Sequence, residues 1–290
     1  MAGLAPGHRF TEHLVQLGDI TFGLVDEAGV HWHCDSDDGW SGPDTRMDLS
    51  QREADHGAWP SPAYMAERVV TLAGRVFAPS RAAADEAFDR LLAAAALTDT
   101  VLTVHETVPK QLVVRRSGKP LIKRLTGTVL EYSLQVTAAD PRRYATVEET
   151  GWTSLPFASG GLTPPLTPPV VSDAVTTSGE ITATNTGSCE TRLRFTVDGP
   201  VDGPTVFTQM PDGSVIPLLY SQALYEGDQL VIDTDTKTCM LNGYVSRRRF
   251  LTTPAGWPAI PPRSTVGVQF QARYYSSAAL LTARWRSAWL

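Results

Sequence analysis

The fold is organised around residues 39–77, which read GWSGPDTRMDLSQREADHGAWPSPAYMAERVVTLAGRVF. This stretch passes from a loop broken by glycine and proline, through a turn at residues 55–57, into a strand near Gly74. Gly57 and Gly74 stand where we expect positive φ or a close approach of backbones, and the prolines between them stiffen the segment. No spacing in it is typical of a catalytic centre. The stretch therefore predicts an ordered, arginine-bearing loop that feeds a β-strand.

The composition describes a folded, acidic protein. The chain has 290 residues, 42% hydrophobic and 19% charged, and a formal net charge of -6. This length allows two domains, and the negative charge argues against a nucleic-acid binder. The cluster at residues 247–249 is then a solvated or interface patch. We expect Cys34, Cys189 and Cys239 to be reduced and buried, although Cys189 and Cys239 could pair. No apolar run reaches the length of a membrane span.

Residues 1–150 predict a β-rich domain that carries one helix. The helix is expected over residues 81–96, opened by Pro79 and Ser80, because apolar residues recur there at helical spacing along one stripe. That stripe comprises Ala84, Phe88, Leu91, Leu92 and Ala95. The period of two and the turn residues predict strands around the helix. These are expected at residues 19–25, 30–33, 70–76, 100–104, 111–116, 120–125 and 127–138.

The second half predicts a different, purely β domain. Residues 151–172 are rich in proline and glycine without periodicity, so we expect a linker or extended arm there. Residues 173–290 then alternate short strands with turns, which is the pattern of an antiparallel sandwich. The strands are expected at residues 177–186, 191–197, 205–210, 214–219, 229–233, 238–241, 264–275 and 279–285.

Candidate sites for chemistry are weak. His31 and His33 would lie on one face of a strand and could be part of a metal site, but no third ligand has a matching spacing. The acidic run at residues 35–39 fits a solvated turn better than a calcium loop. No nucleophile elbow is present. We therefore expect no catalytic residue, no metal and no cofactor. Trp257, Trp285 and Trp289 could stack on a sugar, although core packing or a subunit contact is the commoner role of such residues.

The chain resembles the distal tail proteins of long-tailed bacteriophages over nearly its whole length, because a series of short motifs occurs in the same order. In the first half the resemblance is carried by Arg52, Asp55-His56-Gly57, Tyr64, Arg68, Gly74 with the following helix, and Ala139-Asp140-Pro141-Arg142-Arg143-Tyr144. In the second half it is carried by Asn185-Thr186-Gly187, Asp198-Gly199-Pro200, residues 224–228 and 231–234, Asn242-Gly243, and Trp285-Arg286-Ser287-Ala288-Trp289.

The resemblance implies a mostly β protein. Its N-terminal domain would be split-barrel-like or sandwich-like with one helix, and its C-terminal domain a galectin-like β-sandwich. It also implies a non-enzymatic structural component of the virion, made in the host cytoplasm and placed at the distal end of the tail. There a homohexameric ring would join the tail tube protein to the tail hub, or tail-associated, protein and to other baseplate or receptor-binding proteins. The lumen would pass the tape measure protein and, transiently, DNA.

A closing ring needs one contact that repeats between identical subunits. The arginine-bearing loop offers paired charges for such a contact. The candidate interface residues are Arg46, Arg52, Asp55, His56, Tyr64 and Arg68. If Arg68 lies in the interface, Arg68→Glu weakens self-association. The alternative function is a carbohydrate-binding or glycan-hydrolysing protein that uses the C-terminal sandwich for host attachment.

Overall fold

A computed structural model describes residues 14–159, 175–177 and 179–290 of the chain. The chain divides into two compact units, one running to Thr146 and including Leu290, the other running from Val147 to Trp289. The elements of the first unit are β1 (Leu14–Leu17), β2 (Ile20–Phe22), β3 (Leu24–Val25), β4 (His31–Asp38), β5 (Thr45–Arg46), β6 (Leu49–Gln51), β7 (Ala58–Pro60), β8 (Tyr64–Met65), β9 (Arg68–Phe77), α1 (Arg81–Ala94), β10 (Thr100–His105), β11 (Lys110–Arg116), β12 (Leu121–Arg124), β13 (Val129–Ala138) and β14 (Arg143–Ala145).

The first unit is built on one antiparallel sheet in the order β2-β1-β10-β11-β13-β9-β4-β3. At its centre β13 pairs with β9 along its whole length, from Val129 opposite Phe77 to Ala138 opposite Arg68. The other edge of β13 is shared, since β12 pairs with one half of it and β11 with the other. Alternate residues of β9 and β13 are buried, which explains why a period of two predicted both strands.

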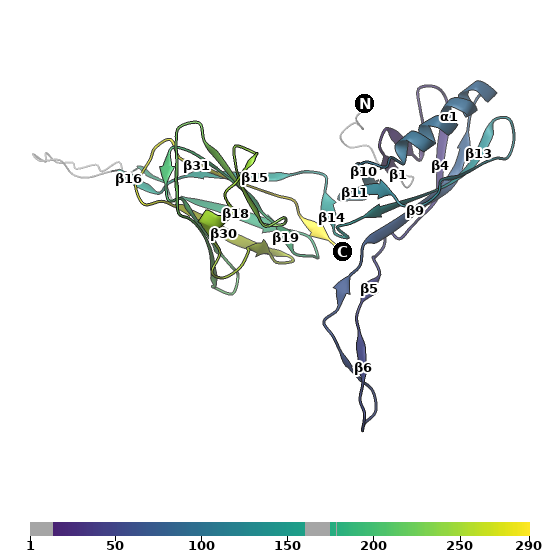
Figure 1. Ribbon diagram of the computed structural model, residues 1–290. Coiled ribbons are helices and arrows are strands. Elements are labelled where there is room, and N and C mark those ends of the chain that lie inside the picture. The colour runs from purple at the N-terminus through teal and green to yellow at the C-terminus, as the bar shows by residue number, and fades with distance from the viewer. Residues whose placement is uncertain (1–13, 160–174, 178) are drawn as a thin grey trace, which may run out of the picture. The chain divides into compact units, whose positions relative to one another are not determined.

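The helix α1 lies on one face of this sheet and contacts β2, β9 and β13 (Figure 1). Ser80 caps it, because its side chain accepts a hydrogen bond from the backbone N–H of Ala83 at 3.2 Å. The predicted helix is confirmed, although it ends at Ala94 and its buried face includes Ala87 rather than Leu92. Arg90 anchors the helix to the β3–β4 turn, where its Nη1 donates to Asp26 at 2.7 Å.

A glycine allows β4, β9 and β13 to lie close together, as the sequence predicts for Gly74. A Cβ at that position would stand 2.1 Å from the carbonyl oxygen of His33 and 2.8 Å from the hydroxyl of Tyr132. The Tyr132 hydroxyl donates to the same His33 oxygen at 2.9 Å. Gly57, the second predicted position, has φ of 91°. One expectation is wrong here: residues 35–38 are not a turn but continue β4, which bulges between Cys34 and Ser36.

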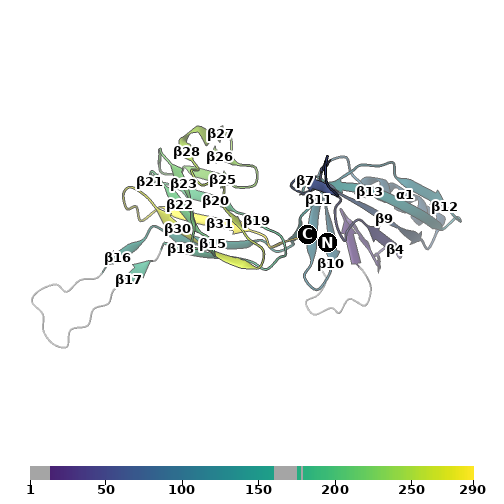
Figure 2. The same cartoon turned by 90° about the horizontal axis from the view of Figure 1, so that it is seen from below.

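The second unit is a sandwich of two antiparallel sheets, ordered β15-β31-β20-β25-β26-β27 and β18-β30-β22-β23-β28 (Figure 2). Both sheets bury alternate residues in one common core. The elements of this unit are β15 (Glu149–Ser154), β16 (Phe157–Ser159), β17 (Val175–Thr177), β18 (Glu180–Asn185), β19 (Thr191–Arg192), β20 (Arg194–Asp198), β21 (Val201–Asp202), β22 (Thr205–Gln209), β23 (Val215–Tyr220), β24 (Ala223–Leu224), β25 (Gln229–Asp233), β26 (Thr238–Leu241), β27 (Val245–Ser246), the 3-10 turn η1 (Arg248–Phe250), β28 (Leu251–Thr252), β29 (Ala259–Ile260), β30 (Ser264–Gln271), β31 (Leu280–Trp285) and β32 (Ala288–Trp289).

The predicted linker at residues 151–172 begins as a strand. Residues 149–154 form β15 and pair with β31, with Glu149 opposite Trp285. Gly151 made this segment resemble a linker, yet it is needed in the sandwich because a Cβ there would lie 2.4 Å from Ile181 Cγ2. Residues 157–159 form a second strand, β16, paired with β17. The remainder of the predicted linker, residues 160–172, lies outside the described residues.

The second unit also buries a polar side chain and two of the three cysteines. Asn185 is fully buried; its Nδ2 donates to the carbonyl oxygens of Cys189 at 2.7 Å and Pro261 at 3.1 Å, and its Oδ1 accepts from Gly187 N–H at 3.0 Å. All three cysteines are free, as expected; Cys189 and Cys239 are buried, and Cys34 is partly buried. Burial raises the pKa of the Cys239 thiol to about 11.

Candidate assembly interface

A long β-hairpin leaves the first unit between β4 and β9, and we call residues 41–67 the arm. Its strands pair in two short ribbons, β5 with β8 and β6 with β7. Backbone hydrogen bonds join the ribbons, as from Ser61 N–H to the carbonyl oxygen of Asp48 at 2.9 Å, and close the tip, from Arg52 N–H to Gly57 at 3.2 Å. The arm extends away from the sheet of its own unit (Figure 1). The predicted arginine-bearing loop is therefore a hairpin with its own ladder.

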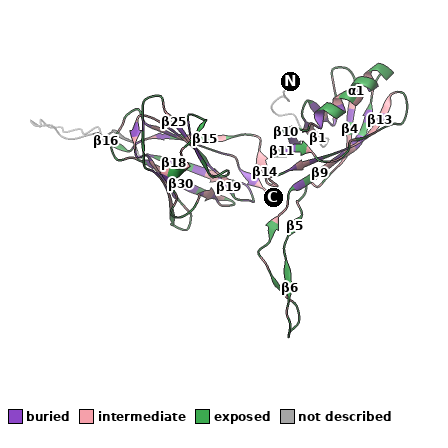
Figure 3. Ribbon diagram, in the orientation of Figure 1, coloured by how far each residue is buried: buried purple, intermediate pink, exposed green. Residues whose placement is uncertain are grey.

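The arm has no core of its own. None of residues 41–67 is buried, and Figure 3 shows the segment almost entirely exposed. Large apolar side chains nevertheless lie on it, with exposed fractions of 57% for Leu49, 64% for Trp59 and 63% for Tyr64. A two-stranded ribbon is marginally stable in water, and clustered exposed apolar groups are typical of interaction surfaces. The arm thus exposes large apolar side chains that no core of its own covers.

Three of the predicted interface residues lie at the arm tip. The guanidinium of Arg52 stands 3.4 Å from the carboxylate of Asp55 and 4.3 Å from the ring centre of Trp59. The backbone N–H of His56 donates to the Asp55 carboxylate at 2.7 Å. Asp55 and His56 are exposed, so the tip presents paired charge and an indole ring to solvent.

Two further predicted residues lie midway along the arm and the last lies at its base. Arg46 and Tyr64 are opposite one another in the β5–β8 ribbon, and both are exposed. Arg68 is instead fully buried at the start of β9, so in this structure its side chain is not accessible to another chain. The structure thus brings five of the six residues together on the arm and separates Arg68 from them.

Arg68 holds the two ends of the arm together. Its Nη1 donates to the carbonyl oxygens of Gly39 at 3.2 Å and Trp40 at 2.6 Å, just before the arm. Its Nε donates to the carbonyl oxygen of Pro141 at 2.8 Å, beyond β13. Burial, followed by the nearby charge of Arg143, lowers the pKa of Arg68 to about 10, so the side chain stays charged near neutral pH.

A second set of contacts supports the base, and sequence reasoning missed it. The indole Nε1 of Trp40 donates to Glu106 at 2.7 Å, Lys110 pairs with the same carboxylate, and Arg143 lies 5.3 Å from the Trp40 ring centre. Burial would raise the pKa of Glu106, but hydrogen bonds from Lys110 and Trp40 and the charges of Lys110 and Arg143 outweigh it and lower that pKa. No short-range spacing links Trp40 to Glu106, so no sequence signal could have found this set.

The structure also shows where the histidines and tryptophans considered as metal or sugar sites lie. The ring of His31 stacks on Phe77 at 5.9 Å, and His33 stands 3.1 Å from Asp35. Among the described residues, no group of three His, Cys, Asp or Glu side chains could hold a metal ion. Trp285 is buried and donates through Nε1 to the carbonyl oxygen of Thr184 at 2.9 Å, so it cannot stack on a sugar. Trp257 packs partly buried against the sandwich core, 5.0 Å from the Arg248 guanidinium.

Exposed apolar side chains such as those of the arm are typical of surfaces that contact other molecules. The sequence matches no family model, and no curated protein matches it. The structure is similar to the crystal structure of the Dit (gp 19.1) protein of phage SPP1, described as a paradigm of the hub adsorption apparatus in phages that infect Gram-positive bacteria. That match has a TM-score of 0.60 at 13% sequence identity and covers 89% of this chain and 93% of the other.

Two structures of the phage P2 baseplate in its activated conformation, one with calcium and one with strontium, each contain a similar chain. Both matches have a TM-score of 0.49 at 9% identity and cover 94% of this chain and 97% of the other. The fold assignment rests on the SPP1 match alone. The chain has the fold of a phage distal tail (Dit) protein, and the predicted class, mostly β with one helix and a C-terminal sandwich, is confirmed. Within the described part of the chain, no helix has the length and apolar character to cross a membrane.

Proposed function

We propose that the protein is a structural subunit at the distal end of a phage tail, where six copies form a ring between the tail tube protein and the tail hub protein. One observation carries this proposal: the Dit fold is matched over 89% of this chain and 93% of the SPP1 protein, so both units correspond. The ring leaves a channel for the tape measure protein and for DNA, and its outer parts meet other baseplate or receptor-binding proteins. The role involves no catalytic step.

The arm is the ring contact in this proposal. A ring of identical subunits closes when one surface of each copy meets a different surface of the next. The arm presents Arg46, Arg52, Asp55, His56 and Tyr64 without a core of its own, so burial against a neighbouring copy would supply the apolar contact that it lacks. Arg68 serves this contact indirectly, because it fixes both ends of the arm.

Light scattering coupled to size-exclusion chromatography, with negative-stain imaging of the main peak, tests the proposal. We expect a particle of six times the chain mass of 31.4 kDa, with a central hole. A stable dimer or trimer would contradict it. So would a protein that stays monomeric at every accessible concentration and also in the presence of its purified tail tube protein.

A further inference from the structure

The outer face of one sandwich sheet carries an unusual set of side chains. Within β22, Val206 and Thr208 are buried, so Thr205, Phe207 and Gln209 lie on the opposite face. The neighbouring strand β30 alternates in the same way, and it places Gln269 and Gln271 on this face. On the other side of β22, β23 places Val215, Pro217 and Leu219 there.

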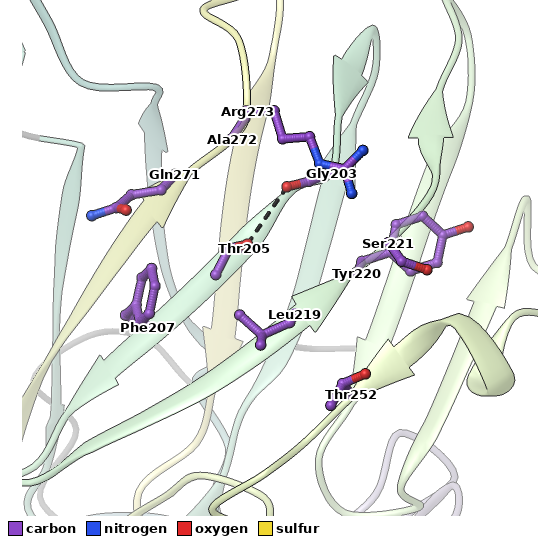
Figure 4. Close-up of a pocket in the computed structure, with 10 residues that line it drawn as sticks. All are labelled: Gly203, Thr205, Phe207, Leu219, Tyr220, Ser221, Thr252, Gln271, Ala272 and Arg273. Atoms are coloured by element: carbon purple, nitrogen blue, oxygen red, sulfur yellow. Dashed lines mark hydrogen bonds between the residues drawn. The ribbon is translucent and has the colours of Figure 1, made fainter.

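The strand register gathers these residues around one aromatic ring. Phe207 lies opposite Gln269 on one side and Pro217 on the other, and Thr205 lies between Gln271 and Leu219. A hollow of about 320 Å³ is lined by four of these residues, Thr205, Phe207, Leu219 and Gln271, together with neighbouring residues of the strands and adjoining loops. Gln269 lies outside this lining, beside Phe207 on the same face. Figure 4 shows Thr205, Phe207, Leu219 and Gln271 around it, from three adjacent strands.

The polar groups of this face are available to a ligand. Among the described residues, the side-chain amides of Gln209, Gln269 and Gln271 have no hydrogen-bond partner, and the Thr205 hydroxyl has only a 3.5 Å contact with the carbonyl oxygen of Gly203. Each amide offers two donors and one acceptor, which matches hydroxyl groups that both donate and accept.

The charge of the face narrows the class of ligand. Strands β22, β23 and β30 place no charged residue on this face, and the edge strand β18 places one carboxylate there, Glu180, opposite Gln269. Arg273, at one end of the hollow, has its guanidinium 3.8 Å from the Asp202 carboxylate, which offsets its charge. A polyanion would find little attraction here, whereas uncharged hydroxyl groups could bind the amides while the apolar face of a sugar ring packs on Phe207.

We propose that the outer face of the β18-β30-β22-β23-β28 sheet binds a neutral oligosaccharide, with Phe207 as the stacking surface and Gln269 and Gln271 as the hydrogen-bonding groups. The site differs from the tryptophans considered in the sequence. It does not depend on ring formation, because all of its residues lie within the second unit.

The test is binding of the full-length protein to an array of neutral gluco-, galacto-, manno- and N-acetylglucosamine oligosaccharides, followed by calorimetric titration of the strongest binder. Phe207→Ala and the double variant Gln269→Ala/Gln271→Ala are each expected to weaken binding at least about tenfold, the loss of roughly one good contact. Trp152→Ala is the matched control, because Trp152 is an exposed aromatic residue on the other sheet.

Three results would overturn the proposal. One is no binding by the wild-type protein to any array member at millimolar ligand. Another is binding that persists in Phe207→Ala and in the glutamine double variant but is lost in Trp152→Ala. The third is a loss of self-association in the glutamine double variant with sugar binding unchanged, which would make the face a protein contact. Because Gln271 is exposed, the glutamine double variant keeps the test valid if Phe207→Ala folds poorly.

Discussion

The Nη1 atom of Arg68 donates to the carbonyl oxygen of Trp40 at 2.6 Å, and the two residues lie on either side of the arm, residues 41–67. One side chain therefore fixes the separation between the strand that leads into the arm and the strand that leaves it. The same guanidinium reaches Pro141, so the arm base is tied to the segment that follows β13. The direction of the arm depends on a charge buried inside its own unit.

Replacing Arg68 tests this dependence. Arg68→Met leaves one buried and two partly buried carbonyl groups without their donor, and we expect it to destabilise the first unit by about 2–4 kcal/mol in urea unfolding. Arg75→Met, at an exposed position on the same strand, is the control and should have little effect. Arg68→Glu is still expected to weaken self-association, but together with protomer stability. Weakened assembly in a protomer of wild-type stability would place Arg68 in the interface instead.

Arg52→Glu tests the arm tip. Arg52 contacts Asp55 and Trp59 at the hairpin tip, where its side chain is only 34% exposed, so the change should lower protomer stability by at most about 1 kcal/mol. It reverses the charge presented to a neighbouring copy, so we expect the assembled fraction in sedimentation velocity to fall. Arg192→Glu is a matched control, since Arg192 forms a comparable surface pair with Glu190 in the second unit. Equal effects of both variants would remove the arm tip from the interface.

The ion pair between Arg90 of α1 and Asp26 predicts that the free energy of unfolding depends on pH. Burial would raise the pKa of Asp26, but hydrogen bonds from Val30, Trp32 and Arg90 and the charge of Arg90 outweigh it and lower that pKa below 3.8. A lowered pKa means stability that is complete above the unfolded value and lost as pH falls through the folded value. We therefore expect the free energy of unfolding to decrease below about pH 4 more steeply in the wild type than in Asp26→Asn.

The control for this prediction is Asp19→Asn, because Asp19 is exposed and lies 3.7 Å from the same arginine. Chemical unfolding at a series of pH values measures the effect. If Asp26→Asn and the wild type lose stability in parallel on acidification, Asp26 does not hold the helix as proposed.

Asn185 predicts a large effect in the second unit. Its amide satisfies backbone groups of three separate segments, at Gly187 and Cys189, at Pro261 and at Ala288, so Asn185→Ala leaves buried donors and acceptors unpaired. We expect a loss of about 3 kcal/mol or more in unfolding of the sandwich, against a negligible change for the exposed Gln222→Ala. A thermal scan that resolves the two units measures it. A lowered transition of the first unit alone would contradict the assignment.

Sequence periodicity could predict the parts of the fold where one face is buried. The strands over residues 70–76 and 127–138 and the helix after Ser80 follow directly from alternation, helical spacing and capping. The strands of the arm could not be predicted this way, because none of their residues is buried and three prolines interrupt them. An element exposed on all sides carries no hydrophobic period.

The candidate interface was predicted less completely than the fold, because the burial of a single side chain depends on tertiary contacts. Five of the six candidate residues share the arm because they are close in sequence, but the burial of Arg68 is a tertiary fact. A charged residue at the head of an alternating strand has the same sequence pattern whether it faces solvent or three carbonyl groups. The oligosaccharide face escaped prediction similarly, since only the register of three strands brings Phe207 beside Gln269.

The pairing of β15 with β31 also sets an order of events during translation. The strand β14 ends at Ala145, so the sheet formed by β1 to β14 can begin to fold once this part of the chain has emerged from the ribosome. The strand β15 follows at once, but its partner, residues 280–285, is synthesised last among the sheet strands of the sandwich and must insert between β15 and β20. Until then the nascent sandwich has an open edge, while the strands β1 to β14 have all been synthesised.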